Sequence, residues 1–185
     1  DELLALAALH LHARGSLAGG GVVVTVMTNF GFHSAMSAAG IAVAATAVGD
    51  RYVLAELRDR GWTLGGEQSG HIIEMGFSPT GDGIASALLA LEALGRGDLR
   101  ERSAMEKLPQ RLVNVRVRDR GALADAAGVH EAVERESASL EGRGRVLVRP
   151  SGTEPLVRVM VEAPTVEETD AVCARLVAVV EQELG

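Results

Sequence analysis

The sequence GVVVTVMT, residues 21–28, is apolar, carries no charge and is rich in β-branched residues. A second run of this kind, IAVAATA, follows at residues 41–47. Short apolar runs bounded by glycine predict strands that are buried on both faces of a sheet. Strands of this type are typical of parallel sheets whose faces are covered by helices.

Helical spacing of apolar residues surrounds these two runs. It predicts helices over residues 2–13, 31–39 and 51–60. Asp50 is expected to be the N-cap of the third helix, and Gly61 is expected to end it. The order helix, strand, helix, strand, helix favours a layered α/β domain with a mostly parallel sheet.

A glycine-rich loop follows this alternation. Short extended segments at residues 62–64 and 71–75 flank the loop at residues 65–70. Asp82 is expected to cap the next helix, over residues 83–94.

The pattern changes near residues 103–110, where a charged stretch ends in Pro109. We therefore expect two domains, at residues 1–106 and 107–185. In the second, Val113, Val115 and Val117 alternate with polar residues, which predicts a half-exposed strand. The remaining predicted elements are a helix over 122–136, strands at 145–149 and 156–162, and a last helix that follows a capping box at Thr165 and Glu168. This is a small α+β domain.

Composition excludes several classes of protein. The 185 residues include 18 Lys and Arg against 25 Asp and Glu, a net charge of −7. Nucleic acids and anionic membrane surfaces bind proteins that carry clustered positive charge. Because this chain is acidic, neither is expected as a partner. No apolar run reaches the ~20 residues that a membrane helix needs, and no signal peptide is recognised. Cys173 is the only cysteine, which excludes an intramolecular disulfide and indicates a reducing compartment, the cytoplasm.

The stretch RPSGTEP, residues 149–155, offers the clearest chemistry. It forms a turn between two predicted strands and brings an arginine, two hydroxyls and the backbone N–H groups near Gly152 within a few residues. Several donors that converge in this way suit a phosphate. Arg158, on the following strand, is positioned to reach the same anion. A plain polar turn with solvated arginines explains the same residues equally well.

The stretch GGEQSGH, residues 65–71, mixes hydrogen-bond donors and acceptors between glycines, as neutral polyols such as sugars require. An ordinary hairpin loop is the alternative. His71 suits a general acid or base, or a structural histidine. The order of residues is not that of the GxSxG nucleophile elbow, which disfavours a serine hydrolase. No three potential ligands show a recognisable metal-binding spacing, so no metal site is expected in this chain.

Four motifs, taken together, resemble those of the α-D-phosphohexomutase family, and most closely its bacterial phosphoglucosamine mutase branch. They are VGDRYV at 48–53, GGEQSGHI at 65–72, TGDGI at 80–84 and RPSGTEPLVRVMV at 149–161. The resemblance covers essentially the whole chain, which is similar to the third and fourth of the family's four domains. It implies an isomerase that interconverts glucosamine 6-phosphate and glucosamine 1-phosphate on the way to cell-wall precursors. The resemblance further implies that a phosphoserine donates the phosphoryl group, that magnesium is the cofactor, and that a bisphosphorylated sugar is both the intermediate and the activator.

The resemblance also implies roles for particular residues. Glu67 and Ser69 are expected to hydrogen-bond sugar hydroxyls, and His71 is the candidate for proton transfer near the reacting phosphoryl group. The turn at residues 149–155 is expected to hold the phosphate that is not reacting, through Arg149, Ser151, Gly152 and Thr153, with Arg158 assisting.

Several features depart from the family pattern or distinguish its branches. No DGD triplet and no Ser-His-Asn-Pro run occurs, so we expect the phosphoserine and magnesium to belong to the N-terminal domains, and this chain alone to be inactive. Ala47 stands where many relatives carry lysine, so no lysine contact is inferred. Gln68 favours the glucosamine branch, because phosphomannomutase/phosphoglucomutase relatives commonly carry Met there.

Three alternatives stay open at this point: a mutase of mannose or glucose phosphates, a non-catalytic sugar-phosphate-binding module, and a purely structural half that contributes to oligomerisation. The expected partners are the sugar phosphate and the N-terminal domains of the same enzyme. A homodimer is possible.

Overall fold

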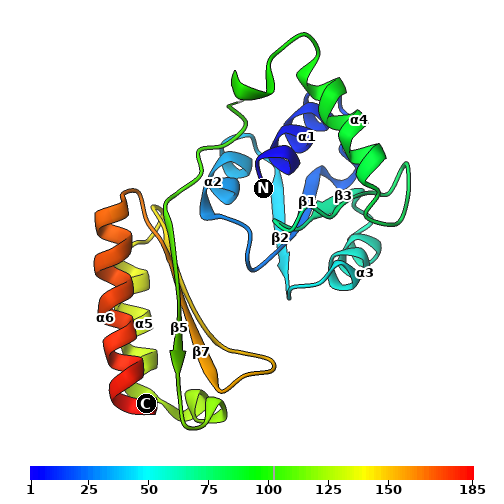
Figure 1. Cartoon of the computed structure of the whole chain (residues 1–185). Coiled ribbons are helices and arrows are strands. Elements are labelled where there is room, and N and C mark those ends of the chain that lie inside the picture. The colour runs from blue at the N-terminus through cyan, green and yellow to red at the C-terminus, as the bar shows by residue number, and fades with distance from the viewer. Residues whose placement is uncertain (102) are drawn as a thin grey trace. The chain divides into compact units, whose positions relative to one another are not determined.

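Residues 1–101 and 103–185 are described by a computed structural model (Figure 1). The chain divides into two units, Asp1–Lys107 and Leu108–Gly185. Among the described helices, none combines the length and hydropathy that crossing a bilayer demands.

The first unit builds one sheet from the alternation that the apolar runs predict. Its elements are α1 (Glu2–Ala13), β1 (Gly21–Thr25), α2 (Phe30–Ala38), β2 (Ala42–Thr46), α3 (Asp50–Arg60), β3 (Leu64–Gly66), β4 (Ile72–Glu74) and α4 (Gly83–Leu94), with short 3-10 turns at Ala18–Gly20 and Leu99–Glu101. The strand order is β2-β1-β3-β4. β1 is parallel to β2 and β3, and only β4 is antiparallel, which confirms the mostly parallel sheet.

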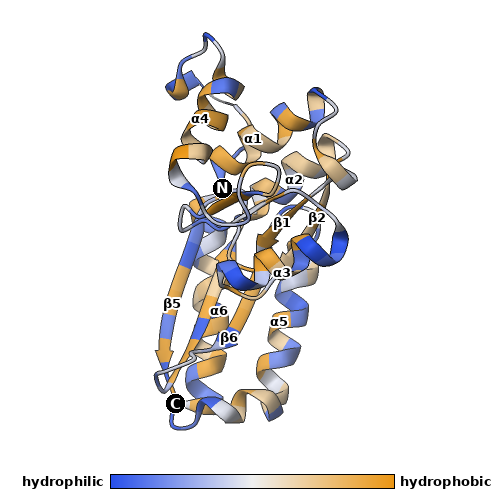
Figure 2. Cartoon of the chain, turned by 90° about the vertical axis from the view of Figure 1, so that its right-hand side faces the viewer, coloured by the Kyte–Doolittle hydropathy of each residue, from blue (hydrophilic) through white to orange (hydrophobic). Residues whose placement is uncertain are grey.

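β1 is completely buried because helices cover both faces of the sheet at this strand. Val22 and Val24 belong to a core cluster with residues of α1 and α2, whereas Val23 belongs to another with residues of α3. Successive strand residues point to opposite faces, so one apolar run supplies two cores. Figure 2 shows β1 in the hydrophobic colours of the scale.

Two expectations about this unit are wrong. β2 is half exposed, with Ala42 and Ala45 open to solvent, because it lies at the edge of the sheet and pairs with β1 alone. Asp50 is the first residue of α3 and not its N-cap, which is Gly49. Gly61 ends α3 in the left-handed conformation, and the Asp82 side chain caps α4 through the N–H groups of Ile84 and Ala85, both as expected.

The second unit is a two-layer α+β structure. Its elements are β5 (Gln110–Arg116), a 3-10 helix at Arg120–Asp125, α5 (Ala127–Ser139), β6 (Arg145–Pro150), β7 (Leu156–Glu162) and α6 (Val166–Leu184). The strands pair antiparallel in the order β5-β7-β6. The helix expected over 122–136 is two pieces, because the backbone at Ala126 is not helical (φ −78°, ψ 83°).

One face of the second sheet carries the core of this unit. Val115, Val157 and Val159 pack in one cluster with α6, where Leu176 is also buried. Thr165 caps α6 by accepting from the Glu168 N–H at 3.2 Å, as the capping box predicts. The alternate residues of the same strands, which include Arg149 and Arg158, therefore project from the other face.

A charged pair joins α5 to α6. Arg175 donates to both carboxylate oxygens of the buried Glu136, at 3.0 and 2.6 Å. These bonds hold the pKa of the Glu136 carboxyl below its usual range. Cys173, on α6, is buried, and burial raises the pKa of its thiol, which suits an inert core residue.

Candidate functional site

The GGEQSGH stretch is a tight hairpin between β3 and β4. Gly65 and Gly66 belong to β3 and are buried, so the loop is shorter than the sequence predicts. The Glu67 N–H donates to the His71 carbonyl at 2.9 Å, and the Gly70 N–H donates to the Glu67 carbonyl at 3.1 Å. Gly70 has φ 104°, a conformation that glycine tolerates.

This hairpin brings together the three side chains predicted for the sugar site. Ser69 Oγ lies 3.2 Å from His71 Nδ1, and Glu67 Oε2 lies 3.8 Å from the same nitrogen. Glu67 is 9% exposed, whereas the side chain of His71 is 58% exposed. A buried carboxylate and a hydroxyl thus orient an accessible imidazole through Nδ1, which leaves Nε2 directed elsewhere.

Two further loops reach this hairpin. Glu67 Oε1 accepts from the Gly49 N–H at 2.9 Å. A Cβ built on Gly81 would lie 3.3 Å from Cδ2 of His71, so the ring packs against this glycine. The motifs at 48–53 and 80–84 therefore adjoin the sugar hairpin, and both contribute to an open hollow of about 190 Å³. Its lining is Asp50, Arg51, Leu54, Ile73, Pro79, Thr80 and Gly81.

We predict that Gly65→Ala destabilises the first unit and displaces this hairpin. The added Cβ would lie 2.8 Å from Val53 Cγ1 and 2.9 Å from the Val23 carbonyl oxygen, and overpacking of this kind costs about 1–3 kcal/mol. The measurement is urea unfolding followed by the fluorescence of Trp62, in the same unit. Gly83→Ala is the control, because its Cβ would meet nothing within 4 Å. Equal stability of both variants would show that the contact at Gly65 is not close.

The RPSGTEP turn joins β6 to β7 in the second unit. The Ser151 N–H donates to the Leu156 carbonyl at 2.8 Å, and Ser151 Oγ accepts from the Glu154 N–H at 3.3 Å. Ser151 is 2% exposed, whereas Gly152 and Thr153 are exposed. Ser151 thus holds the turn from within, and the next two residues are open to solvent.

Two arginines flank this turn on the face of the sheet opposite the core. Arg149 on β6 is paired in register with Arg158 on β7, and Asn114 on β5 is the other neighbour of Arg158. Burial, and then the charge of Arg158, lower the pKa of Arg149. The Nε of Arg158 is buried and has no hydrogen-bond partner within the described part of the chain. Two adjacent positive groups, one with an unused donor, favour an anion between them.

A third arginine, which belongs to none of the sequence motifs, contacts the turn. Arg120 Nη1 donates to the Ser151 carbonyl at 2.7 Å. The two residues are 31 positions apart. A local sequence motif cannot predict this contact, because the contact depends on the packing of the 3-10 helix beside the turn.

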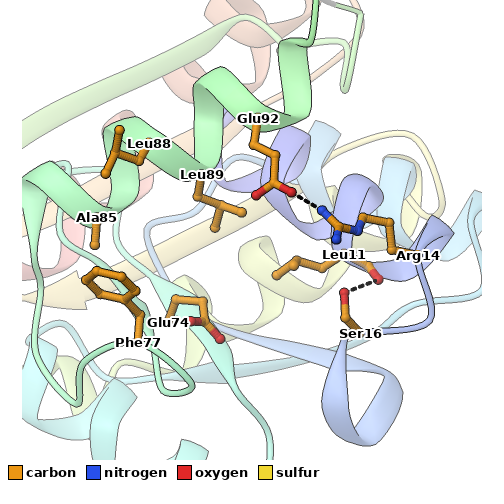
Figure 3. A pocket seen from close by; sticks show the side chains of 9 residues that line it. All are labelled: Leu11, Arg14, Ser16, Glu74, Phe77, Ala85, Leu88, Leu89 and Glu92. Carbon is orange, nitrogen blue, oxygen red and sulfur yellow. Dashed lines mark hydrogen bonds and ion pairs between the residues drawn. The ribbon is translucent and has the colours of Figure 1, made fainter.

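A separate hollow of about 350 Å³ lies between α1 and α4 (Figure 3). Its lining combines apolar side chains, such as Leu11, Leu88 and Phe77, with polar ones, and Arg14 and Glu92 form an ion pair in it. None of the predicted site residues lines this hollow. The described residues also contain no group of three or more His, Cys, Asp or Glu side chains arranged to hold a metal ion.

Solved structures of sugar-phosphate mutases share this fold. N-acetylphosphoglucosamine mutase of Aspergillus fumigatus superposes with a TM-score of 0.79 at 20% identity, over 99% of this chain and 43% of the other. A phosphoglucomutase/phosphomannomutase family protein from Burkholderia thailandensis gives 0.75 at 18% identity, over 99% and 41%. At these identities the likeness establishes the architecture.

Sequence comparison establishes the family. The model of the phosphoglucomutase/phosphomannomutase alpha/beta/alpha domain III matches residues 1–112, and the model of the C-terminal domain of the same family matches residues 112–179. The chain therefore belongs to the phosphoglucomutase/phosphomannomutase family, as the four motifs predict.

Curated relatives narrow the comparison further. Phosphoglucosamine mutase of Parafrankia sp. is 53% identical over all of this chain and 40% of its own length, and that of Desulforudis audaxviator is 51% identical over 97% and 41%. Phosphoglucosamine mutase of Lactococcus lactis subsp. cremoris is 44% identical over 100% and 42%. The chain thus spans about 40% of the length of the curated relatives it matches.

Proposed function

We propose that this chain forms the sugar-binding and phosphate-binding half of a phosphoglucosamine mutase, which interconverts glucosamine 6-phosphate and glucosamine 1-phosphate. The observation that carries the proposal is the pairing of Arg149 with Arg158 beside a turn in which Gly152 and Thr153 are exposed. The choice of an amino sugar is supported by relatives that are named phosphoglucosamine mutase and are 44–53% identical.

The two units have different roles in this proposal. Arg149, Arg158 and the N–H groups of Gly152 and Thr153 hold the phosphate that is not reacting, and Ser151 supports the turn. Glu67 and Ser69 bind sugar hydroxyls, and His71 moves a proton at Nε2 beside the reacting phosphoryl group. Phosphoryl transfer depends mainly on positioning and charge stabilisation, so an anchored phosphate allows one donor to serve either end of the sugar.

The donor and the metal lie outside this chain in our proposal. The described residues offer no ligand set for magnesium, and the sequence has neither the DGD triplet nor the Ser-His-Asn-Pro run. The Aspergillus fumigatus mutase has been solved in complex with GlcNAc-6P and magnesium, which supports a magnesium-dependent reaction in the family. We propose that the chain alone binds sugar phosphate weakly and does not turn it over, and that the full-length enzyme acts in the cytoplasm on cell-wall precursors.

The test is a comparison of substrates with the full-length protein. Glucosamine 6-phosphate, glucose 6-phosphate and mannose 6-phosphate are each supplied with magnesium and a trace of the matching sugar bisphosphate. We expect kcat/KM to favour glucosamine 6-phosphate by about tenfold or more, because polar groups built for one substituent reject its analogue. A preference for glucose or mannose phosphate would contradict the glucosamine assignment. Binding of all three without turnover would favour a non-catalytic module.

A further inference from the structure

Arg120 contacts the phosphate turn from the neighbouring 3-10 helix. It is half buried and begins the 3-10 helix at Arg120–Asp125. The Asp119 carboxylate accepts from the Gly121 N–H at 2.8 Å, which fixes the start of this helix. From there the guanidinium donates to the Ser151 carbonyl at 2.7 Å. A charge-assisted bond of this length is among the stronger hydrogen bonds in proteins.

This bond sets the direction of the peptide between Ser151 and Gly152. The described residues contain no cis peptide bond, and in a trans peptide the C=O and the following N–H point in opposite directions. Because Arg120 holds the Ser151 oxygen, the Gly152 N–H is directed away from Arg120.

The donors left over are those of Gly152 and Thr153. The Ser151 N–H bonds to Leu156, and the Glu154 N–H bonds to Ser151 Oγ. Within the described residues, the N–H groups of Gly152 and Thr153 donate to no protein acceptor, and both residues are exposed. These are the two backbone donors that an anion at the turn would engage.

The Ser151 side of this peptide is held by the bonds to Leu156 and Glu154, whereas the Gly152 side is open. A Cβ at Gly152 would meet nothing within 4 Å, so the space beside Gly152 leaves room for the peptide plane to rotate. Such a rotation would turn the Ser151 carbonyl oxygen toward the anion in place of the Gly152 N–H, and two partial negative charges would then face each other.

We propose that Arg120 is a positioning residue of the phosphate site, which acts by holding the Ser151 carbonyl so that the Gly152 N–H faces the phosphate. The inference rests on the proposed function, because it requires a phosphate at this turn. It adds a residue from outside the RPSGTEP motif to the machinery of the site.

The experiment titrates inorganic phosphate, and separately glucosamine 6-phosphate, into the 185-residue chain while the amide NMR signals of Gly152 and Thr153 are followed. The variants are Arg120→Ala, which removes the bond, and Arg120→Lys, which keeps a charge and a donor. Arg118→Ala is the matched control, because Arg118 is an exposed arginine two positions away that loses the same charge. Unchanged signals from β5, β6 and β7 show that each variant is folded.

We expect Arg120→Ala to weaken phosphate binding by about tenfold, Arg120→Lys to recover most of the loss, and Arg118→Ala to change the affinity by less than about twofold. The loss should persist when the salt concentration is raised, since screening weakens a charge effect but does not restore a peptide's direction. Three results would overturn the role of Arg120 while leaving the phosphate site intact. They are phosphate affinity of Arg120→Ala equal to that of the natural chain, no recovery of affinity in Arg120→Lys, and a loss of affinity that vanishes at high salt. If phosphate leaves the amide signals of both Gly152 and Thr153 unchanged in the natural chain, the phosphate site itself is overturned, and so is the proposed role of Arg120.

Discussion

Arg149→Ala should raise the KM of the full-length enzyme for glucosamine 6-phosphate by about 10- to 150-fold. A hydrogen bond to a charged group contributes about 1.5–3 kcal/mol, and about 1.4 kcal/mol corresponds to a factor of ten. Arg149 is half buried, and its burial, followed by the adjacent charge of Arg158, lowers its pKa, so we expect an anion between the two arginines to be favoured. In the 185-residue chain, the same substitution should sharply reduce the weak binding of sugar phosphate, measured by titration calorimetry.

Arg118→Ala is again the control for loss of charge. Arg118 lies in the same unit, is exposed, and follows β5 without belonging to the phosphate turn. We expect the KM of the Arg118→Ala enzyme, and the affinity of the Arg118→Ala chain for sugar phosphate, to stay within about twofold of the natural protein. Binding by Arg149→Ala that equals that of the natural chain would contradict the assignment of this turn as the phosphate anchor.

His71→Asn should lower kcat of the full-length enzyme by at least about 100-fold, with KM changed only a few fold. Proton transfer by a positioned side chain contributes about 10²–10⁴ to a rate. Asparagine keeps a polar atom near the place of Nδ1, where His71 faces Ser69 at 3.2 Å and Glu67 at 3.8 Å, but it cannot exchange a proton at the place of Nε2. A loss in kcat without a matching loss in binding separates a role in proton transfer from one in holding the sugar.

His12→Asn serves as the control for this substitution. His12 is exposed on α1, away from the hairpin, and its replacement should leave kcat within about twofold. If His71→Asn also retained full kcat, the structural-histidine interpretation, which the sequence leaves open, would be the correct one.

Local patterns in the sequence were sufficient for the architecture. The run at residues 21–28 has apolar side chains for both faces of a sheet, and its strand, Gly21–Thr25, is completely buried. The local sequence of a run did not predict which other strands lie beside it in the sheet. The run at 41–47 is similarly apolar, yet β2 is half exposed, because the number of neighbours of a strand is a property of the whole sheet.

The motifs in the sequence determined the family, and the types of side chain available for sugar and phosphate binding: Glu67, Ser69 and His71 in one stretch, Arg149 and the open turn in another. Their roles stay predictions. Only the tertiary structure showed that Gly49 donates to Glu67, that Gly81 packs against the His71 ring, and that Arg120 holds the Ser151 carbonyl. The physical reason is that these contacts join loops 10 to 31 positions apart, which meet because strand pairing and helix packing place them side by side. A hydrogen bond between such loops produces no periodic pattern in the sequence from which it could be predicted.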